Sequence, residues 1–401
     1  MGKDKIADNQ TDKKSKEVNH EANGRSCMGI CTVVLLVIVG LFAATVLLVP
    51  SPIDPKPFSL PEPLPKLEGP LEQNEELRKT ERLYKGQIAG PESIAIDAEG
   101  TVYTGLADGR IVKFVDGKIV DVARTGKPPC GSPELESTCG RPLGMRFNRY
   151  GTKLIVADAY YGLLEVDILS GSISTLVPPT PGVHEEPFKF FNDLDIDRKG
   201  TIYFTDSSTK WQRKDNRFAI LEGDASGRLM AYHKTGELEV LVSGLHFANG
   251  VQITTEGDAV LVVETALSRI LKYYIKGPDE GKAEIFMDNL PGFPDNIRQS
   301  SNGGYWIGFS GVRKAPFSML DMLAPKPLLR KIIAKLIPQE WIIKLVPKYG
   351  LILEVSDTGR ILRSFHDPGG EVVSSASEVH EENGVLYIGS YFDIFLGKLK
   401  L

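Results

Sequence analysis

The feature that most constrains the fold of this chain is a strand–turn–strand unit that recurs from about Tyr84 to the last residue, Leu401. Each unit has an alternating apolar strand, a glycine-containing turn such as Ala98-Glu99-Gly100, a second strand, and a third that begins near a Gly-Arg or Ser-Arg pair. Units of three or four strands that repeat at roughly 40–50 residues are typical of β-propellers. We therefore predict an all-β fold in which residues 84–401 form a β-propeller.

Strand alternation puts these units in phase. When apolar residues at i+2 and i+4 face one side of the first strand, residue i marks an equivalent place at the start of each unit. Neighbouring equivalent places lie roughly 50 residues apart, except that the last interval also contains an insertion at residues 312–348. The count predicts six blades. The equivalent residues are Glu92, Leu143, Asn192, Asn249, Asp295 and Ser377.

Carboxylate or amide side chains occupy four of the six equivalent places: Glu92, Asn192, Asn249 and Asp295. The innermost strands of a propeller begin around one mouth of its central channel, so these side chains are expected to meet there, with Asn296 beside Asp295. Two carboxylates and several amide oxygens suit Ca²⁺, and the lack of Cys or His in the set argues against zinc. The alternative for each residue taken singly is a turn residue that binds its own backbone.

An apolar segment at residues 27–49 precedes the repeats, and no charged residue or His occurs from Ser26 to Ile53. A helix of this length can cross a bilayer, which predicts an uncleaved transmembrane signal-anchor. A cleaved signal peptide is the alternative, although its apolar region is usually shorter, about 7–15 residues. The excess of Lys and Arg on the N-terminal side predicts a cytoplasmic tail at 1–26 and a type II single-pass protein. The propeller would then be extracellular or lumenal, at the plasma membrane or the endoplasmic reticulum.

Two further segments lie outside the repeats. Residues 50–83 are rich in proline, which predicts an extended linker between the anchor and the propeller. The insertion at 312–348 predicts a basic amphipathic helix, which either packs on the propeller as a lid or contacts anionic lipid, and both can hold. Its apolar stripe contains Leu328, Leu329, Ile332, Ile333, Leu336 and Ile337, with Arg330, Lys331 and Lys335 off the stripe.

Two cysteines, Cys130 and Cys139, lie in a loop rich in Gly, Pro and Ser. The topology assigns this loop to the extracellular or lumenal side, where oxidation is allowed. We therefore expect a Cys130–Cys139 disulfide.

Several short motifs resemble a known family: "GPESIA" at Gly90, "CGRPLGM" at Cys139, "FND" at Phe191, "FANGV" at Phe247 and "FPDN" at Phe293. From about Tyr84 onward the chain resembles the six-bladed calcium-dependent hydrolases that include strictosidine synthase-like proteins, paraoxonases and gluconolactonases. The resemblance implies metal ligands at Glu92, Asn192, Asn249 and Asp295, with Asn296 as a further ligand, and arylesterase-like activity.

Two departures from the family pattern bear on the chemistry. Ser377 stands where strictosidine synthase has a glutamate, so the alkaloid-forming condensation is not expected. The stretch "VADAYYG" from Val156 lacks the histidine that paraoxonases place there, so the general base stays open. The candidates for it are Asp295 and His380, with His184, His246, Asp193 and Glu378 as further possibilities.

The formal net charge of −5 argues against a nucleic-acid partner. The first hypothesis is a membrane-anchored, calcium-dependent esterase that hydrolyses small ester or lactone substrates. The alternative is a non-catalytic receptor or adhesion propeller in which the calcium is structural. The bilayer is a predicted partner through residues 27–49 and through the insertion.

Overall fold

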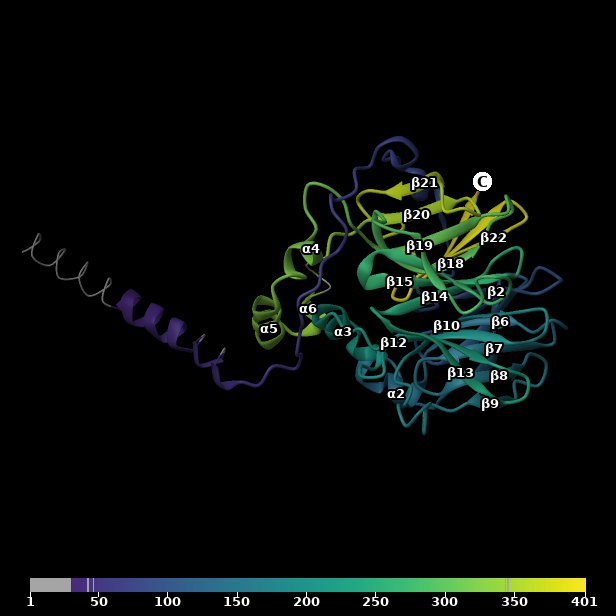
Figure 1. The fold of residues 1–401 in the computed structure, drawn as a ribbon, viewed down its shortest axis with the longest axis horizontal. Coiled ribbons are helices and arrows are strands. Elements are labelled where there is room, and N and C mark those ends of the chain that lie inside the picture. Colours follow the sequence, from purple (N-terminus) through teal and green to yellow (C-terminus); the bar gives the residue numbers. More distant parts are fainter. Residues whose placement is uncertain (1–29, 42, 46, 343, 345) are drawn as a thin grey trace, which may run out of the picture.

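The computed structural model describes residues 30–41, 43–45, 47–342, 344 and 346–401. Within these residues, the strands form six four-stranded antiparallel sheets. The innermost strands contact one another in turn, and the sixth contacts the first, so the sheets close into a ring. The predicted six-bladed β-propeller is confirmed (Figure 1).

The blades follow the chain in order. The first contains β2 (Ile94–Ile96), β3 (Val102–Gly105), β4 (Arg110–Val115) and β5 (Lys118–Arg124). The second contains β6 (Pro142–Phe147), β7 (Lys153–Asp158), β8 (Gly162–Asp167) and β9 (Ile173–Val177). The third contains β10 (Phe191–Ile196), β11 (Ile202–Asp206), β12 (Gly227–Tyr232) and β13 (Leu238–Leu245). The fourth contains β14 (Ala248–Ile253), β15 (Ala259–Glu264), β16 (Arg269–Tyr274) and β17 (Ala283–Met287). The fifth contains β18 (Gly292–Gln299), β19 (Tyr305–Val312), β20 (Gly350–Val355) and β21 (Ile361–Asp367).

The sixth blade joins both ends of the propeller. It contains β22 (Glu378–Glu382), β23 (Val385–Gly389), β24 (Leu396–Lys400) and, as its outer strand, β1 (Glu81–Leu83). β1 pairs antiparallel with β24, with Arg82 opposite Gly397. The propeller thus begins at residue 81, inside the segment that the sequence assigned to the linker, because β1 supplies the fourth strand of the last blade.

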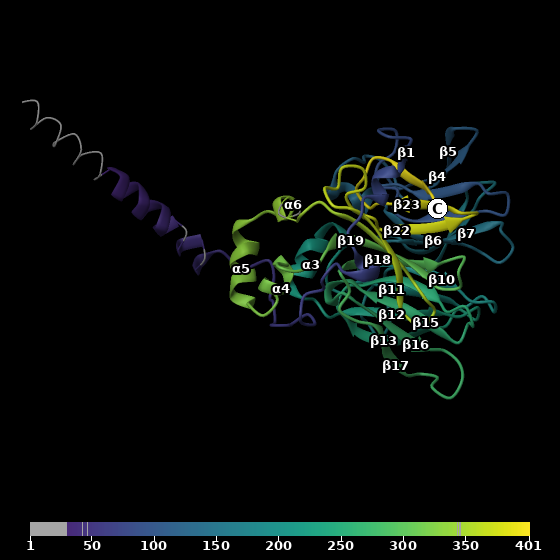
Figure 2. The ribbon, with the colours of Figure 1, turned by 90° about the horizontal axis from the view of Figure 1, so that it is seen from above.

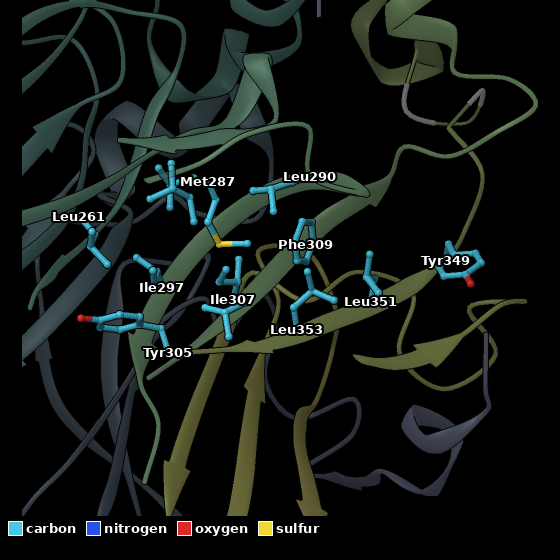
Figure 3. Packing of buried hydrophobic residues seen from close by; sticks show 13 residues of the cluster. Leu261, Met287, Leu290, Ile297, Tyr305, Ile307, Phe309, Tyr349, Leu351 and Leu353 are labelled. Carbon is cyan, nitrogen blue, oxygen red and sulfur yellow. The ribbon is translucent and has the colours of Figure 1, made fainter. Parts of the chain in front are cut away.

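Alternating apolar residues on neighbouring blades form the core. Between the fourth and fifth blades, Leu261 on β15 packs in one cluster with Ile307 and Phe309 on β19 and with Leu351 and Leu353 on β20 (Figure 3). Each of these five side chains is fully buried. Burial of one such side chain stabilises the folded state by about 1.5–3 kcal/mol, so these blade-to-blade contacts hold the ring rigid around its axis.

The proline-rich segment is extended up to two short 3₁₀ turns, η1 (Gly69–Leu71) and η2 (Glu76–Lys79). It lies against the folded domain rather than free of it, since Ile53, Leu60 and Leu77 are buried. The Nη2 atom of Arg313 donates a hydrogen bond to the carbonyl oxygen of Pro61. Proline carbonyls without partners in their own segment thus bind to groups in the insertion.

Over its described residues the insertion contains three short helices, α4 (Met319–Leu323), α5 (Pro327–Leu336) and α6 (Gln339–Ile342). With α3 (Asn216–Glu222) they cover one side of the propeller in both views, and α5 contacts both α3 and α4 (Figures 1 and 2). The smaller elements are η3 (Pro133–Leu135), α2 (Glu136–Cys139), η4 (Arg213–Asp215) and η5 (Thr265–Leu267).

Helix α5 buries a side chain that lies off its apolar stripe. Arg330 is fully buried, and its Nη1 atom donates to the carbonyl oxygens of Leu221 and Glu222 at 2.9 Å each. Leu328, which belongs to the apolar stripe, is 70% exposed. Arg330 is buried because the last carbonyl oxygens of α3 have no partners within that helix. A guanidinium can donate hydrogen bonds to them, whereas an apolar side chain cannot.

The N-terminal apolar segment is helical over residues 30–41, which project from the side of the propeller that carries the insertion (Figures 1 and 2). No helix among the described residues has both the length and the apolar character needed to cross a membrane. The predicted anchor also includes residues 27–29, 42 and 46, which lie outside the described residues, as does the predicted tail at 1–26. The anchor and the topology therefore stay predictions.

The predicted disulfide is present. The Sγ atoms of Cys130 and Cys139 are bonded, and their Cα atoms lie 5.5 Å apart.

Candidate functional site

The innermost strands are irregular where the sequence placed the metal ligands. Antiparallel register shifts between Phe191 and Leu194 on β10, and between Ala248 and Val251 on β14. A third shift falls between Pro294 and Ile297 on β18. A β-bulge at such a place redirects side chains that would otherwise alternate across the sheet. Asn192, Asn249, Asp295 and Asn296 all lie within these bulges.

Neighbouring inner strands approach each other closely at the mouth of the central channel, beside the predicted ligands. A Cβ atom added to Gly250 would lie 2.7 Å from the Cα atom of Asn296 on the next blade. One added to Gly144 would lie 2.5 Å from the Cα atom of Asp193. Only glycine allows such contacts, so the residues next to Leu143 and Asn249 bring the blades together.

The structure brings the five predicted ligands to this mouth, and hydrogen bonds orient them. The Nδ2 atom of Asn249 donates to Oδ1 of Asp295 at 2.7 Å, and Nδ2 of Asn296 donates to Oε1 of Glu92 at 3.0 Å. The Nδ2 atom of Asn192 donates to Oγ of Ser207 at 2.9 Å. Each amide therefore directs its nitrogen to a protein acceptor.

Three oxygen atoms of the same cluster are buried without a hydrogen-bond partner: Oε2 of Glu92, Oδ1 of Asn249 and Oδ1 of Asn296. An unpartnered buried acceptor costs about 1–3 kcal/mol. Three such atoms in one cluster of carboxylates and amides fit the oxygen ligands of a hard divalent cation.

The two carboxyl groups are in an environment that opposes their charge. Burial raises the pKa of Glu92 to about 8, and the nearby charges of Asp295 and Glu378 act in the same direction. Burial raises the pKa of Asp295 to about 7, although the hydrogen bond from Asn249 works against the rise. Without a cation both groups tend to hold protons near neutral pH, and a cation at the cluster would reverse this.

The donor set decides which cations fit. In the described part of the chain, no three His, Cys, Asp or Glu side chains form a metal-binding group. The mouth has two carboxyl groups, and amides supply the remaining oxygens. A set of this kind fits cations that prefer carboxylate and carbonyl oxygen over sulfur or imidazole.

Below the mouth, Arg298 on β18 links two buried acids. Its Nη1 atom lies 2.7 Å from Oδ2 of Asp193, and its Nη2 atom lies 2.5 Å from Oε2 of Glu378. All three side chains are almost completely buried. Asp193 and Glu378, which the sequence offered as possible bases, are therefore ion-pair partners of an arginine.

Ser377 and His380, which the sequence also singled out, lie on or beside β22. Ser377 precedes β22, and its Oγ atom donates to the main-chain oxygen of Glu92 at 3.1 Å. His380 lies on β22 opposite Tyr387. Burial, together with the charges of Arg146 and Arg298, lowers the pKa of His380 to about 3, so its ring is neutral at physiological pH. His380 is not among the residues that line the cavity above the cluster.

That cavity has a volume of about 550 Å³ and lies between the mouth and the helices of the insertion. Glu92, Asn192, Asn249 and Asp295 line it on the propeller side. Apolar side chains line much of the rest. The volume is in the range of sites that bind small organic molecules. The apolar lining includes Leu143, Phe190, Phe247, Leu320, Leu323 and Ile342.

Arginines near the mouth were missed by the sequence reasoning. The Nη1 and Nη2 atoms of Arg141 donate to the main-chain oxygens of Gly90 and Tyr391 at 2.9 Å each, which ties together two loops beside Glu92. Arg213 is paired with Glu136. A charged residue inside an apolar strand pattern could have identified Arg298. The arginines on loops and on α3 carry no such signal, because strand alternation assigns them no phase.

Solved structures share the fold. A gluconolactonase from Xanthomonas campestris superposes with a TM-score of 0.56 at 16% identity, covering 88% of this chain and 99% of that one. A regucalcin from Agrobacterium tumefaciens, described as a calcium-binding protein, gives a TM-score of 0.51 at 14% identity, covering 81% of this chain and 92% of that one. At these identities the likeness shows the shared propeller architecture.

Sequence comparison shows a closer kinship. The family model described as strictosidine synthase matches residues 192–278, and the model described as strictosidine synthase-like, N-terminal, matches residues 69–114. Adipocyte plasma membrane-associated protein of Gallus gallus is 50% identical over 366 residues, which cover 90% of this chain and 87% of that protein. The chain therefore belongs to the adipocyte plasma membrane-associated protein family of strictosidine synthase-like propellers.

Proposed function

We propose that this protein is a membrane-anchored, calcium-dependent hydrolase of carboxylic esters or lactones. The observation that carries the proposal is the convergence of three unpartnered, buried oxygen atoms beside an apolar cavity. A cation site with only a structural role would not need a cavity beside it. A cavity alone would not explain why these oxygen atoms have no hydrogen-bond partners. The propeller lactonases and the calcium-binding regucalcin found among the structural neighbours support the same direction.

Calcium is the cation we propose, because it accepts six to eight oxygen ligands in flexible geometry, including neutral amides. Glu92, Asn192, Asn249, Asp295 and Asn296 would hold it. When bound, a calcium ion supplies positive charge that polarises an ester carbonyl and favours ionisation of a nearby water.

The side chains around the cluster have separate tasks in this proposal. Apolar residues of the cavity, such as Phe190 and Leu320, exclude bulk water and hold the organic part of the substrate. Asp295 lines the cavity, and its Oδ1 atom already accepts a hydrogen bond from Asn249, which leaves Oδ2 as the acceptor for a proton from the attacking water. His380 is a weaker candidate, because a pKa lowered to about 3 makes its ring a poor base.

We also propose that the bilayer lies on the side of the insertion. Apolar side chains of the N-terminal helix, such as Leu36, are exposed, and so are Phe317, Leu328 and Trp341 of the insertion. Both segments lie on one side of the propeller (Figure 2). The relatives named as plasma membrane-associated proteins support membrane association. With 27–49 as a signal-anchor and 1–26 as a cytoplasmic tail, the propeller would be extracellular or lumenal.

The test is hydrolysis of phenyl acetate by the full-length chain in nonionic detergent, with Ca²⁺ or with excess chelator. Turnover should require calcium, and Asp295→Asn should lower it by at least about tenfold without unfolding the protein. Glu92→Gln should lower turnover in the same way. Its matched control is Glu99→Gln, because Glu92 precedes β2 and Glu99 is exposed in the turn that follows β2. A folded, calcium-stabilised protein that turns over neither aryl esters nor lactones would contradict the proposal and favour a receptor with a structural calcium.

A further inference from the structure

Helix α3 places an arginine without a partner in the cavity. Arg217 lines the cavity, and its Nε atom is buried without a hydrogen-bond partner. Among the described residues no salt bridge or hydrogen bond to its side chain is present. Arg213, four residues earlier, also lines the cavity but is neutralised by Glu136. Arg217 is therefore a cation that faces a ligand-sized space and lacks an anion.

Arg217 lines the same cavity as Asp295 of the proposed reaction centre. Tyr391 also lines the cavity. Burial raises the pKa of Tyr391 to about 12; the positive charge of Arg217 opposes this rise and the charge of Asp295 adds to it. Tyr391 thus lies within range of both charges. One cavity holds the oxygen cluster and the unpaired guanidinium.

The other charges of the cavity do not neutralise Arg217. Lys314 and Lys348 line it as well and add positive charge. Its acids are Glu92 and Asp295, which belong to the proposed cation site. When a cation occupies that site and offsets these two acids, the remaining charge of the cavity is positive. A positively charged cavity favours an anionic ligand.

The shape and chemistry together define that ligand. A guanidinium presents a planar set of donors that matches a carboxylate or phosphate, and a partly desolvated one gains most from such a pairing. The apolar walls, including Leu320, Leu323 and Ile342, suit a hydrocarbon chain or ring. We propose that the cavity binds an amphipathic anion, with a carboxylate or phosphate held by Arg217 and an apolar chain along the insertion helices. The inference rests on the proposed function in that it names the substrate class: esters or lactones that carry such a group.

The experiment measures binding rather than turnover. The full-length chain in phosphatidylcholine nanodiscs is titrated calorimetrically, with chelator present, with hexanoate, hexyl phosphate and hexanol. The two anions should bind at least about tenfold more tightly than hexanol, and the stronger anion identifies the headgroup. Arg217→Gln should abolish this preference while hexanol binds as before. Arg217→Lys should keep part of it, because it keeps the charge without the planar fork.

Two controls make the outcome decisive. Arg198→Gln, in the exposed turn after β10, should keep the full preference. Asp295→Asn, which removes turnover under the proposed function, should keep or increase it, because the variant removes a negative charge from the cavity. Equal affinity for the three probes, or a preference that survives Arg217→Gln, overturns the inference. Since the titration needs neither calcium nor chemistry, its result is independent of whether the ester hydrolysis itself fails.

Discussion

The Nδ2 atom of Asn296 donates a hydrogen bond of 3.0 Å to Oε1 of Glu92, so a side chain of the fifth blade binds one of the first. These blades are not neighbours in the ring, and the pair therefore reaches across the mouth of the channel. The second oxygen of each group, Oε2 of Glu92 and Oδ1 of Asn296, is buried without a partner. Two residues 204 positions apart thus present unpartnered oxygens from one hydrogen-bonded pair.

The first prediction follows from this pair. Glu92→Gln should raise the melting temperature in chelator at pH 8, because it replaces a buried carboxyl whose charged form burial disfavours with a neutral amide. In calcium the same variant should be less stable than the wild type, because a ligand charge is lost. Differential scanning calorimetry of both proteins, with Glu99→Gln as control, measures the two changes. A variant that is destabilised equally in both buffers contradicts the metal site.

The second prediction concerns pH. The pKa values of Glu92 and Asp295 are raised in the folded protein to about 8 and about 7. At these two groups the folded state therefore binds more protons than the unfolded state, and without calcium the stability of the protein should fall as pH rises from about 7 to 9. Below this range the lowered pKa values of the buried His366 and His380 act in the opposite direction. The free energy of unfolding should change by about 1.4 kcal/mol per pH unit for each proton that the folded state binds and the unfolded state does not. Calcium should flatten the decline, because it stabilises the ionised groups. Chemical denaturation across this range measures it, and increasing stability in chelator would be the contrary result.

The third prediction tests the ion network below the mouth. Arg298→Met leaves the buried carboxylates of Asp193 and Glu378 without their counter-charge. Such a loss costs roughly 3–5 kcal/mol of the free energy of unfolding. Arg198→Met on the surface should change it by less than about 0.5 kcal/mol. Urea denaturation compares the two variants, and a small effect of Arg298→Met would show that the acids are protonated rather than paired.

The fourth prediction concerns the Cys130–Cys139 disulfide. Replacing both cysteines with alanine releases a short loop, for which the chain-entropy account gives a loss of about 2–3 kcal/mol. The loop precedes Arg141, whose guanidinium bonds the loops beside Glu92. The double variant should therefore melt at a lower temperature than the wild type under non-reducing conditions. An unchanged melting temperature would show that the loop does not stabilise the folded state.

Sequence reasoning reached the blade count and the position of the oxygen cluster because both depend on strand alternation. The same position in the alternating pattern of the inner strands holds Glu92, Asn192, Asn249 and Asp295. Folding keeps this register, because a shift of one residue along a strand would turn its apolar side chains away from the core. The β-bulges that direct Asn192, Asn249 and Asp295 were not visible in the pattern, yet they lie at the same places in the inner strands.

Other features depend on contacts that no local pattern encodes. β1 is three residues long and contains Glu81 and Arg82, so it has no apolar alternation; main-chain pairing with β24 alone defines it. Arg330 is buried because the end of α3, over a hundred residues earlier, offers it carbonyl oxygens. The position of Arg217 in a cavity could likewise not be predicted, because segments far apart in the sequence enclose that cavity.

Calcium binding by the oxygen cluster is measured by calorimetric titration of the full-length protein beside Glu92→Gln and Glu99→Gln. The account predicts saturable calcium binding by the wild type and by Glu99→Gln, with release of protons at pH 7 as the carboxyl groups ionise. In Glu92→Gln the affinity should fall by at least about tenfold, which corresponds to 1.4 kcal/mol. Equal calcium affinity in all three proteins, or no binding by the folded wild type, would contradict the account.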